Sequence, residues 1–135
     1  MNLMTTEKAA KLIKYMEYED AGKIISEITT AKAASYLNAV EKDRASKILD
    51  AVVDMGKEEK AALITLYIPH EKAADIVLCS SKSSQIMDEA TSINIDSATS
   101  ILKTCVQIDL EKTASIVENM KAESAAKLLI SLARS

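Results

Sequence analysis

Hydrophobic positions recur along this chain with a period of twelve residues. A small residue, Ala9, is followed by apolar residues three, four and seven positions later, and the arrangement returns at Ala21, Ala33 and Ala45. Looser copies follow, with anchors at Ala61, Ala73, Ser83, Ala98, Thr113 and Ala125. Apolar residues at i, i+3, i+4 and i+7 form one face of an α-helix. Each copy therefore predicts one short amphipathic helix.

Three columns of the repeat, named +3, +4 and +7 by their offset from the anchor, are apolar almost throughout. The +3 column is apolar in every copy, whereas the +4 column is broken once, by Thr65, and the +7 column once, by Ser80. Buried side chains are selected for apolar character. We expect the least variable positions to be buried, namely Leu12, Ile24, Leu37, Ile48, Ile76, Ile101, Ile116 and Leu128.

A twelve-residue period is incompatible with one long helix or a coiled coil. At about 100° per residue, twelve residues carry the apolar face about 120° beyond three full turns, so that three copies would spread it around the whole cylinder. The helix must break once per copy, and successive helices must stack to complete a shared core. The sequence predicts an all-α solenoid of about ten short helices, forming a single domain over residues 1-135.

Helix boundaries are marked less clearly than helix faces. The strong breakers are Gly22, Gly56 and Pro69. Because Gly22 lies inside a copy, we expect it to allow close backbone packing. Side chains that can cap helix starts occur at Thr5-Thr6, Thr29-Thr30 and Asp96-Ser97. The poorest copy surrounds Ser83, and the sequence predicts a hinge across residues 79-96.

Composition narrows the function classes. The net charge is −3 with acids and bases interleaved, and the four tyrosines are the only aromatic residues. A nucleic-acid groove needs a basic stripe with aromatic side chains for stacking, so we expect no nucleic-acid partner. No apolar run approaches the ~20 residues of a membrane-spanning helix, and the start of the chain resembles no signal peptide. We expect no direct membrane insertion and a cytoplasmic location.

Residues capable of catalysis or metal binding are few and scattered. Cys105 occupies the apolar +7 column and is expected in the core, whereas Cys79 is expected to be partly exposed. The single histidine, His70, follows Pro69 at a helix start, where we expect it to face solvent. No phosphate-binding glycine loop, metal-ligand cluster or nucleophile–base pair is recognisable. We therefore expect no enzyme activity and no cofactor.

Charged columns flank the apolar ones. An acid usually stands two residues before the anchor, where it complements the positive end of the helix dipole. A base commonly follows it at position −1, as in Lys8, Lys32, Arg44, Lys60, Lys72, Lys82 and Lys112. Such charges stabilise helices locally. The sequence alone gives them no binding role.

The segment from Ile68 to Val77, Ile-Pro-His-Glu-Lys-Ala-Ala-Asp-Ile-Val, resembles the unit repeated in the N-terminal cytosolic domain of MgtE-type magnesium transporters. Related units occur in the flagellar motor switch protein FliG. The resemblance extends from Thr5 to Leu132 and implies a right-handed superhelix of short helices. Of the family's many prolines only Pro69 is present, and no magnesium ligand can be assigned to a residue of this chain.

Two functions agree with these observations. The first is a non-enzymatic interaction or scaffold module, binding a protein partner or another copy of the chain. The second, implied by the resemblance, is a Mg²⁺-responsive regulatory domain of a transporter or larger protein. Terminal units of a solenoid have one neighbour each and need a polar cap or a partner. Because both ends are apolar, we expect interaction through an end, with candidate residues Tyr15, Met16, Tyr18, Leu129 and Leu132.

The register of the repeat makes a stability prediction. Replacing Ile76 by Ala removes a core side chain and is expected to cost about 2–5 kcal/mol of unfolding free energy. Chemical denaturation of the two proteins measures the difference. An unchanged midpoint would show that the columns are assigned incorrectly.

Overall fold

The computed structural model describes residues 5–135, and over this range the chain is all-α, with ten helices and no strand. The helices are α1 (Thr6–Lys14), α2 (Tyr18–Glu27), α3 (Thr30–Asn38), α4 (Lys42–Asp54), α5 (Glu58–Tyr67), α6 (His70–Cys79), α7 (Ser83–Ile93), α8 (Ile95–Ile108), α9 (Leu110–Glu118) and α10 (Ala122–Arg134). The predicted all-α class and helix number are confirmed.

Successive helix starts show the period directly. The first four helices begin at residues 6, 18, 30 and 42, each twelve after the last. The longer step to α5 arises because α4 extends to 13 residues and ends in a turn at Gly56, whose φ of 79° favours glycine. A second long step follows α8, which has 14 residues.

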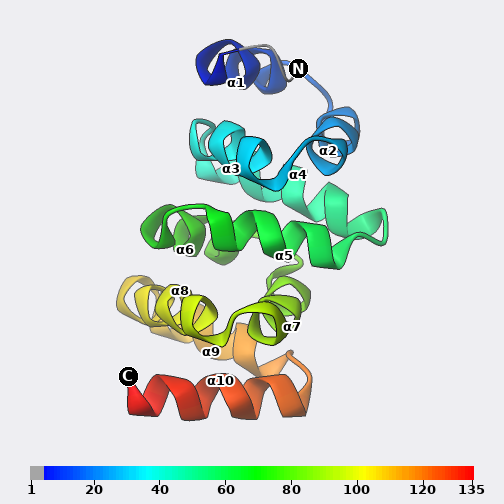
Figure 1. Cartoon of the computed structure of the whole chain (residues 1–135). Helices are drawn as coiled ribbons and strands as arrows, with labels where there is room; N and C mark the ends of the chain where they lie inside the picture. The colour runs from blue at the N-terminus through cyan, green and yellow to red at the C-terminus, as the bar shows by residue number, and fades with distance from the viewer. Residues whose placement is uncertain (1–4) are drawn as a thin grey trace.

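Helices stack mainly on the helix two positions along the chain. Such pairs are α2 with α4, α3 with α5, α4 with α6, α5 with α7, α6 with α8 and α8 with α10. Figure 1 shows the resulting layers, with α1 at one end of the stack and α10 at the other. Each layer covers the apolar face of the one before it.

The core follows the predicted columns except at the beginning of the chain. Six of the eight predicted core residues are buried: Leu37, Ile48, Ile76, Ile101, Ile116 and Leu128. Ile24 is only partly buried, and the prediction for Leu12 is wrong because its side chain is 41% exposed. The reason is positional: among residues 5–135 no helix lies two positions before α1 or α2 to cover them.

Helix starts agree in part with the predicted caps. Thr5 accepts a hydrogen bond from the Lys8 backbone N–H at 3.2 Å, and Thr29 caps α3 in the same way. The prediction of a cap at Asp96-Ser97 is wrong, because Asn94 caps α8 and accepts from the Ser97 N–H at 3.1 Å. Asp109, which the sequence reading overlooked, caps α9.

Gly22 marks a close contact between α2 and α4. It is buried, and a Cβ placed on it would lie 3.0 Å from the Cβ of Ala51. Because Ala51 Cβ is fixed to its helix backbone, a larger residue at position 22 would force the helices apart. The close packing predicted for this glycine is confirmed.

Replacing Gly22 by Val is therefore expected to destabilise the protein by about 1–3 kcal/mol through overpacking. Ala31→Val, at an exposed position of α3, is the matched control and should cost less than about 1 kcal/mol from helix propensity. Equal thermal or denaturant midpoints for the two variants would contradict a tight α2–α4 contact.

Candidate functional site

Exposure at the two ends reveals which neighbour each apolar column contacts. The +3 column is buried from α3 to α10, whereas Ile24 on α2 is only partly buried and Leu12 on α1 is exposed. The +4 column is buried from α1 to α8, whereas Val117 on α9 is only partly buried and Leu129 on α10 is exposed. It follows that +3 side chains pack towards earlier helices and +4 side chains towards later ones.

The N-terminal end face is formed by Leu12, Ile24 and the neighbouring Tyr15, whose side chain is 84% exposed. Met16, predicted to take part in interaction, is partly buried against the core. Tyr18 lies beside α4, with the Arg44 guanidinium 4.9 Å and the Lys47 ammonium 5.5 Å from its ring centroid. Both cations are within the range of cation–π attraction, so Tyr18 contributes to an internal contact.

The C-terminal end face lies on α9 and α10. Leu129 is 47% exposed and Ile130 is 52% exposed, whereas Leu132 is partly buried against the core. Among the predicted interaction residues, Tyr15 and Leu129 are exposed, Tyr18 is 37% exposed, and Met16 and Leu132 are partly buried. Sequence reasoning missed Leu12 and Ile130, although the terminal position of Leu12 in an array was a usable signal.

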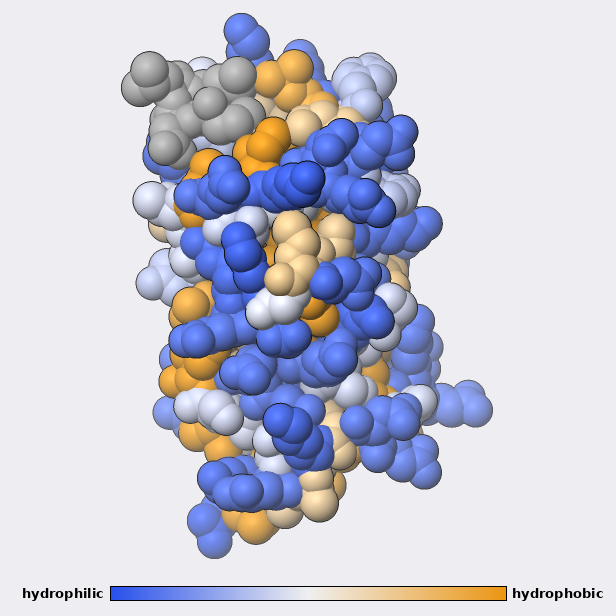
Figure 2. Space-filling view, turned by 90° about the vertical axis from the view of Figure 1, so that its right-hand side faces the viewer, coloured by the Kyte–Doolittle hydropathy of each residue, from blue (hydrophilic) through white to orange (hydrophobic). Residues whose placement is uncertain are grey.

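The long side of the stack differs from its ends. In Figure 2 hydrophilic residues cover most of this side, and the hydrophobic areas are largest near the end occupied by α1 and along one edge. Single exposed apolar residues are normal on protein surfaces. The uncovered +3 and +4 columns differ because they belong to a face that is buried everywhere else in the chain.

Three bases at position −1 form hydrogen bonds across the stack. Arg44 donates to the carbonyl oxygens of Ile13, at 3.1 Å, and of Met16. Lys60 donates to the Ile28 carbonyl at 2.8 Å, and Lys72 to the Val40 carbonyl at 2.7 Å. Each base thus reaches the carboxyl end of the helix three positions earlier, where carbonyl groups lack helical partners. The sequence reading had assigned these bases only a local role.

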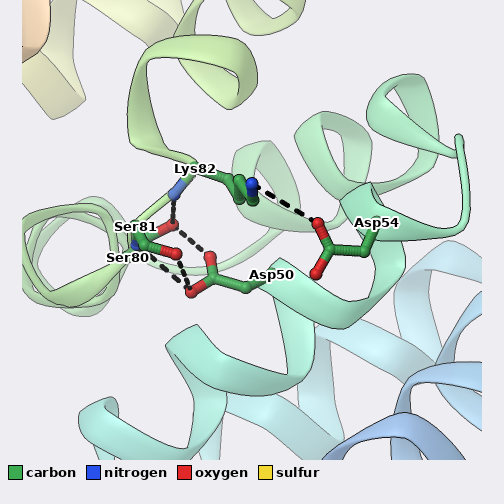
Figure 3. A network of polar contacts seen from close by, with 5 residues as sticks. All are labelled: Asp50, Asp54, Ser80, Ser81 and Lys82. Atoms are coloured by element: carbon green, nitrogen blue, oxygen red, sulfur yellow. Dashed lines mark hydrogen bonds and ion pairs between the residues drawn. The ribbon is translucent and has the colours of Figure 1, made fainter.

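The connection between α6 and α7, inside the predicted hinge at 79-96, is tied to α4 by polar side chains (Figure 3). The Asp50 carboxylate accepts hydrogen bonds from the Ser80 hydroxyl, from the Ser81 N–H at 3.1 Å and from the Ser81 hydroxyl at 3.0 Å. Lys82 forms an ion pair with Asp54 at 3.5 Å. The hinge itself stays a prediction.

An acid on α7, three helices after α4, makes a contact equivalent to that of Asp50. Asp88 stands five residues after its anchor, as Asp50 does, and accepts a hydrogen bond from the Lys121 N–H at the start of α10 at 3.0 Å. Asp50 and Asp88 therefore each bind the beginning of the helix three positions later. Such acids stabilise the positive end of a helix dipole.

The described cysteines occupy the predicted environments. Burial raises the pKa of Cys105 to about 12, and burial together with a hydrogen bond to Asp43 raises the pKa of Cys79. At neutral pH both are thiols, the less nucleophilic form. His70 is exposed, as expected. Within residues 5–135 no three His, Cys, Asp or Glu side chains are grouped to hold a metal ion, and no helix is long and apolar enough to cross a membrane.

Two hollows on the described surface are open grooves. One, of about 590 Å³, runs between α1 and the connection from α3 to α4, and its lining includes Lys14, Tyr18, Glu41 and Arg44. Another of about 590 Å³ separates α8 from α10 beside the C-terminal end face. Both grooves have mixed charged and apolar walls, and they adjoin the two ends of the stack.

Comparisons of this chain with protein-family models, curated proteins and solved structures found no match. The resemblance to the MgtE N-terminal domain accordingly stays a prediction from the repeat.

The Asp50 contacts lead to a stability prediction. Asp50→Ala leaves the Ser81 N–H without its charged acceptor and is expected to cost about 1–3 kcal/mol. Asp54→Ala, which removes only the exposed ion pair with Lys82, should cost less than about 1 kcal/mol. Urea denaturation of both variants measures the difference. Equal losses would show that the Asp50 network adds no more than a surface charge pair.

Proposed function

We propose that this chain is a non-enzymatic interaction module, a right-handed superhelical solenoid that binds protein surfaces through its ends. The observation that carries the proposal is the exposure of Leu12 and Leu129, which occupy columns that are buried along the rest of the stack. Burying a fully exposed leucine is worth about 1.5–3 kcal/mol. With 41% and 47% of their surface exposed, Leu12 and Leu129 can each contribute somewhat less than half of that to binding a partner.

Two sets of contacts support the superhelical part of the proposal. Helices pack on the helix two positions along, and side chains such as Arg44, Lys72 and Asp50 reach the helix three positions along. A chain whose helices contact the helices two and three positions further along winds about an axis. Its handedness is taken from the resemblance to the MgtE N-terminal domain, and the alternative of a Mg²⁺-responsive domain rests on that resemblance alone.

Site-specific photo-cross-linking in the native host tests the proposed role of the ends. A photoreactive residue placed at Leu12 or Leu129 is expected to form discrete protein adducts. The same residue at Tyr67, which is 61% exposed on α5 in the middle of the stack, is the matched control and should form none. Equal or absent cross-linking at all three positions would contradict an interaction through the ends.

A further inference from the structure

The two ends of the stack carry the two halves of one interface. Inside the chain, the +4 residues of one helix face later helices and the +3 residues of those helices face back. At the C-terminal end, Leu129 is an exposed and Val117 a partly buried +4 residue, and no described helix lies two positions after α9 or α10. At the N-terminal end, Leu12 is an exposed and Ile24 a partly buried +3 residue, and no described helix lies two positions before α1 or α2. Each end therefore has the side chains that the other lacks.

The charges of the terminal helices fit the same order. If α1 and α2 of a second copy followed α10, they would pack on α9 and α10 respectively, by the rule of two positions. Helix α1 has three lysines and one glutamate and a net charge of +2, whereas α9 has two glutamates and one lysine and a net charge of −1. Opposite net charges favour this pairing and speed encounter.

The second pair is complementary in the opposite sense. Helix α2 has three acids and one lysine and a net charge of −2, whereas α10 has two bases and one glutamate and a net charge of +1. Both helix pairs of a head-to-tail junction thus join opposite net charges.

A third feature is the base at position −1 of the first copy. Lys8 occupies the position from which Arg44, Lys60 and Lys72 donate to the helix three positions earlier. It is exposed, and the described residues include no helix before α1. In a continued array the helix three positions before α1 is α8 of the preceding copy.

From these observations we infer that copies of this chain associate head to tail, with α9 and α10 of one copy packing on α1 and α2 of the next. The inference rests on the proposed function and names the partner as a second copy. The contact is heterologous, because different surfaces meet, and each added copy leaves one end face open. The oligomers therefore grow as the protein concentration rises, and association does not stop at a dimer.

Two charge-introducing variants test this arrangement. Leu12→Glu blocks the N-terminal end face and leaves α9 and α10 intact, and Leu129→Glu does the reverse. In sedimentation velocity over about 1 μM to 1 mM, the wild type is expected to show oligomers that grow with concentration, and each variant alone a monomer. An equimolar mixture of the two variants should form a 1:1 dimer and no larger species, because one intact junction remains.

Tyr67→Glu is the matched control and should assemble like the wild type. Circular dichroism checks that each variant keeps its helices, and Leu12→Ser and Leu129→Ser replace any variant that unfolds. Raising the NaCl concentration should weaken assembly, because the junction pairs opposite charges at the surface.

Three results would each overturn head-to-tail association: a wild type that stays monomeric throughout, disruption by only one of the two end variants, or a mixture that remains monomeric. The second would indicate an association of like ends. If the wild type is monomeric while Leu12 and Leu129 still cross-link to another protein, this inference fails and the proposed function stands.

Discussion

The stack depends on the rotation of the apolar face by about 120° with every copy. A face that rotates in this way cannot be buried by one continuous neighbour, so the chain is divided into helices of 9 to 14 residues. Helices of this length are marginal in isolation. Their stability must come from the helices above and below, and the small anchors permit that close stacking. No single layer can be expected to fold without the next.

Polar contacts link the layers at a longer interval than the apolar ones. Bases such as Arg44 and Lys72 bind the carboxyl end of an earlier helix, whereas Asp50 and Asp88 bind the amino end of a later helix. Both kinds of contact place a charge at the helix end that it stabilises. They also fix the relative rotation of the layers, since a hydrogen bond tolerates less displacement than an apolar contact.

Much of the fold could be predicted because the repeat reports which side of each helix is buried. Leu37, Ile101 and Leu128 are buried for that reason. The prediction that Leu12 is buried is wrong because an apolar column shows which positions favour burial but not whether a neighbouring helix is present to bury them. Asn94 stands four residues before its anchor, as the caps Thr5 and Thr29 do, so the spacing of the repeat could have located this cap.

The candidate site could be predicted less well, for two physical reasons. Tyr18 is 37% exposed but also contacts Arg44, and Met16 is partly buried against the core; only tertiary packing decides these contacts. The cross-stack hydrogen bonds join residues far apart in sequence, such as Lys72 and Val40. Their donor side chains resemble other surface lysines, and no feature of the local sequence distinguishes the two groups.

The buried thiol of Cys105 can report how often the interior of this protein opens. Its Sγ lies 3.8 Å from the Ala74 carbonyl oxygen of α6 and is closed off from solvent, whereas Cys79 is partly open. A thiol reagent can reach Cys105 only when α6 and α8 separate, so its rate of modification measures how often the middle of the stack opens. Cys79 supplies the reference rate for an accessible thiol in the same molecule, and no label needs to be introduced.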